Sequence, residues 1–289
     1  MNWSLWAISL VLLLFGCGGV LAQDGRLQRV RDDVNSSSSS GQSSGSSSCN
    51  DDSILGNLFG CLLNGLFSSE VLLAPFYIPA AMLDDDYHHN MPFTPYPYVG
   101  SYRGYQVLPI ETAQELYDIE TNDVLRKNWA GRVSIENGND FSGLNRFNGQ
   151  LRLEHLSRFG IITNWNYFRE DLGNGRYDET VIGDTNLTFR FAQNEIASMY
   201  AGLGFRVLTD RQQTNFGFNF TYGGDWFPRR PWVVSTSIDV GNLGGAGVFH
   251  VRATVGAVVR GWEIFAGYDL LCIGDTNLQG PLAGLRWWF

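Results

Sequence analysis

The chain has 289 residues and a formal net charge of −9, and only 17% of its side chains are charged, against roughly 25% in an average soluble domain. The negative charge excludes a nucleic-acid-binding protein, which needs a basic surface to neutralise phosphates. Hydrophobic residues make up 44%, yet the mean hydropathy of −0.11 is too low for a bundle of membrane-spanning helices.

Residues 1–22 carry the pattern of a secretory signal peptide. An apolar run, Leu5–Leu21, is followed by Ala22, a small residue suited to cleavage before Gln23. The first four residues contain no Lys or Arg, so two alternatives stay open: an uncleaved membrane anchor and a lipoprotein signal acylated at Cys17. Each of the three interpretations predicts export.

Residues 23–53 form a polar, Ser/Gly-rich segment. It contains too little apolar surface to offset the entropy of ordering, which predicts a flexible linker. Cys49 lies close to Cys61, and the two could form a disulfide in an oxidising periplasm.

Residues 54–127 are predicted to hold an apolar helix and a Pro/Tyr-rich extension. Apolar pairs recur every four residues over Ile54–Phe67, which favours a helix that lies in a membrane interface or packs on the end of a barrel. From Ala74 to Tyr105, proline and tyrosine predict an extended connector. The acidic and histidine residues at 84–89 are interpreted as a solvated turn, and no metal site is predicted.

From residue 128 to residue 289, apolar and polar residues alternate in ten segments. Each has about the length of a tilted, bilayer-crossing strand of roughly 9–11 residues. The segments are 128–137, 143–155, 160–170, 179–191, 197–207, 213–224, 231–240, 247–258, 261–271 and 281–289. The pattern predicts an all-β fold, a closed antiparallel up-and-down transmembrane barrel of about ten strands, with eight or twelve as alternatives. Short links at one end and longer links at 171–178 and 272–280 predict longer loops on the outer side.

Two architectures share this alternation, because a soluble barrel points its apolar residues inward and a membrane barrel points them outward. Tryptophans toward the strand ends favour the membrane barrel, since aromatic girdles mark the two interfaces. They are Trp129, Trp165, Trp226, Trp232, Trp262 and Trp287. The polar faces also lack the lysines of a water-exposed strand, since the chain's one lysine is Lys127.

If the apolar rows face lipid, six arginines and five carboxylates face the lumen. They are Arg132, Glu136, Arg152, Glu154, Arg190, Arg206, Asp239, Arg252, Glu263, Asp269 and Arg286. Such a nearly balanced set suits a closed barrel filled by its own side chains, as in small OmpA/OmpX-type barrels.

The C-terminal strand ends in Trp-Trp-Phe, and Gly284, Trp287 and Phe289 follow a spaced pattern of glycine, hydrophobic residue and final aromatic. This resembles the C-terminal assembly signal of small Gram-negative outer-membrane β-barrels, although Leu282 stands where that family has a polar residue. The resemblance implies location in the cell outer membrane, with outer-membrane lipid and the barrel-assembly machinery as partners. It implies nothing about oligomeric state.

The predicted function is therefore a structural or small-solute role in the envelope, with no cofactor and no catalytic residues. The histidines of the strand region are His155, expected on the lipid-facing row, and His250, expected inside the lumen near Asp239 and Glu263. Neither shows the arrangement of a catalytic site. A narrow, porin-like pore, an outer-membrane hydrolase and a soluble β-barrel that binds an apolar ligand are the alternatives.

Overall fold

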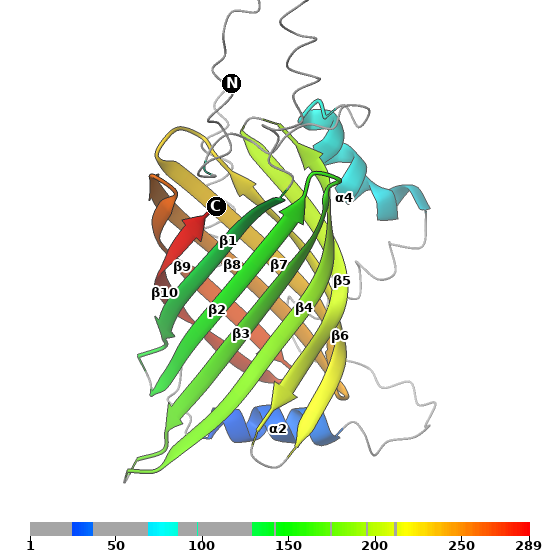
Figure 1. Ribbon diagram of the computed structural model, residues 1–289. Helices are drawn as coiled ribbons and strands as arrows, with labels where there is room; N and C mark the ends of the chain where they lie inside the picture. Colours follow the sequence, from blue (N-terminus) through cyan, green and yellow to red (C-terminus); the bar gives the residue numbers. More distant parts are fainter. Residues whose placement is uncertain are drawn as a thin grey trace, which may run out of the picture.

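Ten antiparallel strands close into a barrel in the computed structural model (Figure 1). It describes residues 25–36, 69–85, 97, 129–141, 143–173, 175–194, 196–210 and 213–289. The strands are β1 (Trp129–Asn139), β2 (Leu144–His155), β3 (Phe159–Asp171), β4 (Tyr177–Gln193), β5 (Ala197–Thr209), β6 (Thr214–Trp226), β7 (Trp232–Leu243), β8 (Ala246–Val259), β9 (Trp262–Ile273) and β10 (Thr276–Trp288). The predicted fold class and strand number are confirmed.

The barrel closes between its first and last strands. Strand β1 pairs with β10 in a register that runs from Arg132 opposite Trp288 to Gly138 opposite Leu282. Next to the Arg132–Trp288 pair, Gly131 and Phe289 exchange two backbone hydrogen bonds of 2.8 Å. Every other strand pairs with its neighbours in the chain, so the sheet has no free edge.

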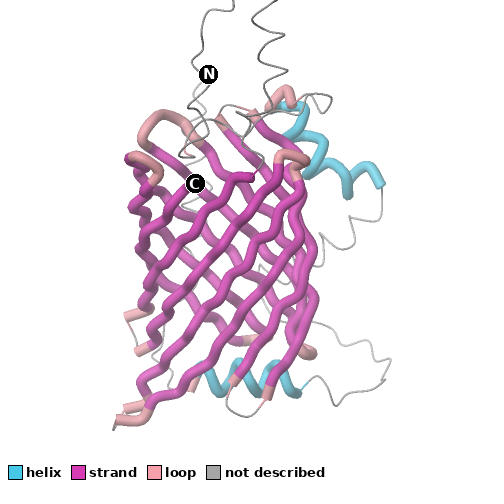
Figure 2. The backbone as a smooth tube through the Cα atoms, in the orientation of Figure 1, coloured by secondary structure: helices cyan, strands magenta, loops and turns pink. Residues whose placement is uncertain are grey.

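The links at both ends of the barrel are short (Figure 2). We call the end that holds Phe289 the C-terminal end, where the links are 156–158, 194–196, 227–231 and 260–261. At the opposite end the links are 140–143, 172–176, 210–213, 244–245 and 274–275. The expectation of a long loop at 272–280 is wrong, because β9 and β10 stay paired up to Ile273 and Thr276, leaving a two-residue turn. Gly274 adopts a φ of +54° there, as tight hairpin turns require.

A helix, α2 (Arg26–Ser36), lies across the end opposite the C-terminus (Figure 1). Leu27, Val30 and Val34 occupy one helical face and are fully or almost fully buried. The Glu170 carboxylate accepts the backbone N–H groups of Arg26 (2.9 Å) and Leu27 (3.0 Å), and so satisfies donors that a helix leaves free at its N-terminus. Residues 26–36 are therefore helical, whereas a flexible linker was expected over 23–53. The helix lies at the end of the barrel opposite Phe289.

A second helix, α4 (Ser69–Met82), lies against the outer wall near the C-terminal end (Figure 1). The extended connector expected from residue 74 is therefore wrong as far as Met82, since the chain is helical through Pro75 and Pro79. Pro79 has no N–H to donate to the carbonyl of Pro75, and the hydroxyl of Tyr222 donates to that oxygen instead, at 2.8 Å. Packing on the barrel thus supports a helix that its local sequence disfavours.

Apolar layers fill the barrel interior near both of its ends. At the α2 end, Leu27, Val30 and Val34 meet inward side chains of eight strands. These are Leu144, Phe168, Ile182, Leu208, Leu243, Ala246, Val248, Leu271, Ile273 and Leu278. At the C-terminal end, the layer consists of Ala130, Leu156, Phe227, Val233, Val258 and Trp288. Charged side chains of the interior lie between these two layers.

The predicted signal peptide, the Cys49–Cys61 disulfide and the helix over Ile54–Phe67 lie outside the described residues.

Truncating the apolar face of α2 tests whether that face holds the helix in the barrel mouth. Leu27→Ala should weaken docking by about 2–5 kcal/mol, since it removes a buried side chain and leaves a cavity. Amide hydrogen exchange over residues 26–36 measures this loss. The control Gln28→Ala alters an exposed neighbour and should leave exchange almost unchanged. Equal exchange in both variants would show that the apolar face does not hold α2.

Candidate functional site

The charged interior of the barrel is the candidate functional site. Alternation along each strand turns the charged residues inward, because side chains two residues apart share a face. The structure places all eleven charged residues of the sequence-derived set inside the wall, each at most 7% exposed. Most join one of two networks, at different depths in the lumen.

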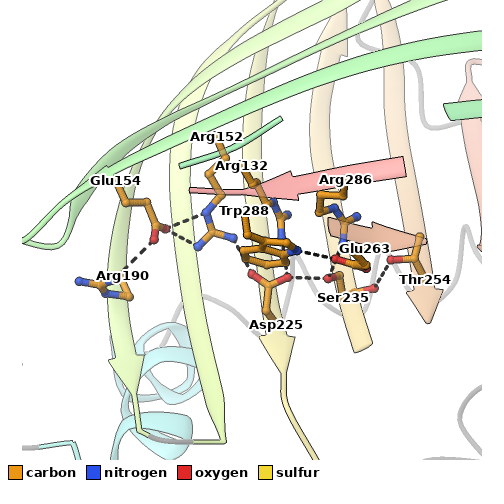
Figure 3. A network of polar contacts seen from close by, with 10 residues as sticks. All are labelled: Arg132, Arg152, Glu154, Arg190, Asp225, Ser235, Thr254, Glu263, Arg286 and Trp288. Carbon is orange, nitrogen blue, oxygen red and sulfur yellow. Dashed lines mark hydrogen bonds and ion pairs between the residues drawn. The ribbon is translucent and has the colours of Figure 1, made fainter. Parts of the chain in front are cut away.

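Asp225 on β6 is the centre of the network nearer the C-terminal end (Figure 3). Its carboxylate accepts Nη1 of Arg132 at 2.7 Å, Nη1 of Arg152 at 2.8 Å and the Ser235 hydroxyl at 2.6 Å. Arg132 lies on β1, five strands from β6 around the barrel in either direction. The Asp225–Arg132 contact therefore connects opposite walls through the lumen.

The same network extends to both sides of Asp225. On one side, Arg152 donates through Nε to Glu154 at 2.7 Å, and Arg190 lies 3.5 Å from the same carboxylate. On the other side, Glu263 accepts Nη1 of Arg286 at 2.8 Å and the indole N–H of Trp288 at 2.6 Å (Figure 3). The buried Trp288 therefore contributes a hydrogen-bond donor as well as apolar area.

The second network lies nearer α2 and also crosses the lumen. Arg146 on β2 contacts both Asp269 on β9 and Glu136 on β1. Glu136 also pairs with Arg252 on β8. Asp269 accepts a hydrogen bond from Nε2 of His250 at 2.9 Å, and Nδ1 of the same ring lies 2.9 Å from Asp239.

Arg206 extends this network toward β4, with Nη2 3.8 Å from Asp184 and 4.0 Å from Asp239. The amides of Asn164 and Asn186 donate to Asp184 at 3.0 and 2.8 Å. These amides satisfy a carboxylate whose nearest guanidinium is too distant for a short hydrogen bond.

Aromatic rings support several of the guanidinium groups. Arg152 lies over the ring of Tyr200, 4.1 Å from its centroid, and Arg286 lies over Phe265 at 4.4 Å. A desolvated guanidinium gains about 2 kcal/mol from such a contact. The rings therefore assist the carboxylates in holding cations away from water.

Sequence reasoning missed Arg146, Asp184 and Asp225. Arg146 and Asp184 have the same strand parity as Arg152 and Arg190, so alternation could have found them. Asp225 lies one residue beyond the expected end of its segment at 224, whereas β6 continues to Trp226. The centre of one network was therefore missed because of a strand boundary.

The two histidines of the barrel are held in structural contacts. Both ring nitrogens of His250 face carboxylates, which leaves no free nitrogen to act as a base. The ring of His155 lies against Trp129, and its Nδ1 is 2.8 Å from the Ser157 hydroxyl. Within the part of the chain that the structure describes, no group of acidic, histidine or cysteine side chains could hold a metal ion. None of the helices described there is long and apolar enough to cross a membrane.

The C-terminal residues of the proposed assembly signal lie on or next to the closing seam. Trp287 faces outward from β10, and Gly284 pairs with Glu136 of β1. The ring of Phe289 covers Gly131, where an added Cβ would come within 2.6 Å of it. Glycine at 131 therefore makes room for the terminal aromatic side chain.

A closed, up-and-down barrel with paired charges inside and apolar side chains outside has the architecture of the outer-membrane β-barrels. Solved structures similar to this chain include the Yersinia pestis outer membrane protein Ail in a phospholipid bilayer nanodisc, with 14% identity and a TM-score of 0.32. That match covers 55% of this chain and 99% of Ail. The crystal structure of Ail, the attachment invasion locus protein of Y. pestis, matches with 16% identity and a TM-score of 0.26, over 56% of this chain and 96% of Ail.

No protein-family model matches the sequence, and no curated protein sequence does. The fold assignment therefore rests on the strand pairing and the two faces of this chain.

Removing the charge of Asp225 tests the importance of the cross-lumen contacts. Asp225→Asn should lower the free energy of unfolding by about 3–5 kcal/mol, because two buried guanidinium groups lose their shared carboxylate. Unfolding of the protein by guanidinium chloride in detergent micelles, followed by tryptophan fluorescence, measures the change in free energy. The same substitution at the exposed Asp275 is the control and should cost less than about 0.5 kcal/mol. Similar stability of the two variants would contradict a supporting role for the network.

Proposed function

We propose that this protein is an integral β-barrel of the bacterial outer membrane, with a structural role in the envelope and a closed lumen. The observation that carries the proposal is the inverted distribution of side chains. Charged residues are buried between the walls, whereas large apolar residues are exposed on the outside of the strands. In water that exterior would be a far larger apolar patch than soluble monomers expose. In a bilayer it is matched by acyl chains.

Two aromatic bands on the exterior support a membrane position. At the C-terminal end, the exposed band consists of Trp129, Phe159, Trp226, Trp232, Trp262 and Trp287. Toward the α2 end, the exposed aromatic residues are Phe147, Tyr167, Tyr177 and Phe216. Aliphatic residues such as Ile135 and Leu203 lie between them, as the two interfaces and the hydrocarbon layer of a bilayer require. Trp165 differs from expectation, since it lies in mid-strand over Gly183.

Filling of the lumen favours a closed barrel over a narrow pore. Paired charges cross the lumen between strands that are not neighbours, and an apolar layer lies on each side of them. A hollow beside Leu144, Arg146 and Phe168 measures about 20 Å³, which is room for about one water molecule. A hydrated ion passing through would have to displace both the apolar layers and the ion pairs.

The export route and partners belong to the same proposal. Residues 1–22 would direct secretion, and the C-terminal pattern at Gly284, Trp287 and Phe289 would engage the barrel-assembly machinery. Outer-membrane lipid is the partner of the exposed strand faces. The eleven lumen charges, together with Arg146, Asp184 and Asp225, would serve to hold the walls together.

A charged substitution on the exterior distinguishes a membrane barrel from a soluble one. Leu203 is the middle residue of β5 and is 56% exposed. Leu203→Arg should reduce the folding free energy in phospholipid vesicles by about 2–4 kcal/mol, whereas Val259→Arg, at a strand end, should cost about 0–1 kcal/mol. Two equally neutral substitutions, together with a stable monomer in detergent-free buffer, would favour the soluble barrel.

Planar-bilayer recordings test the closed lumen. The wild-type protein should give no steady current, because charges and apolar layers occupy the passage. Arg152→Ala should also remain silent, since both apolar layers are retained, and Arg169→Ala on the exterior is its matched control. Insertion is verified separately by flotation with the vesicles. Stepwise currents from inserted wild-type protein would support a narrow pore instead.

A further inference from the structure

Helix α4 is apolar on its packed face and on its exposed face. Phe76, Ala80 and Leu83 lie toward the barrel. The opposite side exposes Leu73 by 58%, Tyr77 by 74%, Ile78 by 53% and Met82 by 63%. The sequence of α4 contains no basic residue, and its one acidic residue is Glu70 in the first turn. A helix that is apolar all round requires apolar surroundings, which the barrel provides on one side alone.

Specific contacts fix α4 to the outer wall. The ring of Phe76 lies 5.2 Å from that of Phe191 on β4 and 6.1 Å from that of Tyr222 on β6, in edge-on geometries. The hydroxyl of Tyr222 also donates to the backbone oxygen of Pro75. Phe191 and Tyr222 belong to the outward rows of their strands, so α4 continues the apolar exterior of the barrel.

The C-terminal end of α4 is polar and firmly attached. Asp84 adopts a φ of +54° and donates its N–H to the carbonyl of Ala81, while the N–H of Asp85 reaches the carbonyl of Ala80. This is the left-handed ending of a Schellman motif. The carboxylate of Asp85 then binds Arg158 of the β2–β3 link through two hydrogen bonds of 2.6 and 2.8 Å. Apolar surface therefore gives way to charge within one turn.

The position of α4 lies within a gap in the tryptophan band. Strands β1, β6, β7, β9 and β10 each place a tryptophan on the exterior at the C-terminal end, whereas β2 to β5 and β8 place none there. Helix α4 lies over Phe191, Ala192 and Met199 in that sector. It covers Phe191 and adds its own apolar and aromatic surface, including Tyr77, in a sector where the strands place no tryptophan.

We propose that α4 is an interfacial helix whose exposed face, Leu73, Tyr77, Ile78 and Met82, is inserted into the lipid bilayer at the level of the tryptophan band. The inference rests on the proposed membrane location of the barrel and adds a lipid-binding element outside the strands. Lipid fits this face better than a second copy of the chain does. Four side chains on one helix fall far short of the roughly 20–30 residues per partner of a stable protein interface.

Photo-crosslinking in lipid vesicles tests the proposal with the full chain. A benzophenone side chain replaces Tyr77 in protein reconstituted into phosphatidylcholine and phosphatidylglycerol vesicles, and lipid adducts are quantified by mass spectrometry. Tyr77 is mostly exposed, so the replacement should not disturb folding. Met82, 63% exposed, is a second labelling site. Leu203 in mid-strand is the lipid-facing control, and Gln28 on the outer side of α2 is the water-facing control.

The expected lipid adduct at Tyr77 is within about twofold of that at Leu203 and well above that at Gln28, since interfacial helices bury their apolar face about 5–10 Å into the acyl boundary. Lipid adducts at Leu203 but none at Tyr77 or Met82 would overturn the role of α4 and leave the barrel assignment intact. Crosslinked dimers at Tyr77 would overturn it in favour of a second copy. An absence of lipid adducts at Leu203 itself would overturn the proposed function.

Discussion

A carboxylate or guanidinium group inside this barrel loses most of its hydration. The main interaction that offsets this desolvation cost is an ion pair with a group of opposite charge. The partners come from different strands. Asp225 on β6 binds Arg132 on β1 and Arg152 on β2, and Arg146 on β2 binds Asp269 on β9. Because these contacts span the lumen, the barrel cannot change its diameter or strand register without uncovering charge. Register, closure and the filled interior therefore depend on one electrostatic requirement.

The period-two alternation made most of the barrel predictable from the sequence. It requires only that one face of each strand differ from the other, and a membrane barrel imposes that difference along every strand. It gave the number of strands and the inward direction of residues such as Arg286. It could not give the pairing, because Arg132 and Asp225 are 93 residues apart and meet only when the barrel has closed. Strand ends were also poorly defined, since pairing continues through Asn277 and Gly280, where a loop was expected.

The two helices were beyond local reasoning for opposite reasons. In α2, the segment is polar on average, and its three apolar residues find a partner only in the mouth formed by eight strands. In α4, two prolines predict an extended chain, but Tyr222 satisfies a carbonyl that Pro79 cannot. In both cases a distant strand supplies what the segment lacks. Tertiary contacts override local propensity most where a segment has little stability of its own.

Helices α2 and α4 are attached to opposite ends of the barrel, each by side chains of strands far away in the sequence. The surface under α2 is assembled from eight strands, with β2 and β10 on the two sides of the strand that closes the sheet. That surface therefore exists only after β1 has joined β10. Although α2 precedes every strand in the chain, it can dock only on the finished barrel, so its docking reports that closure is complete.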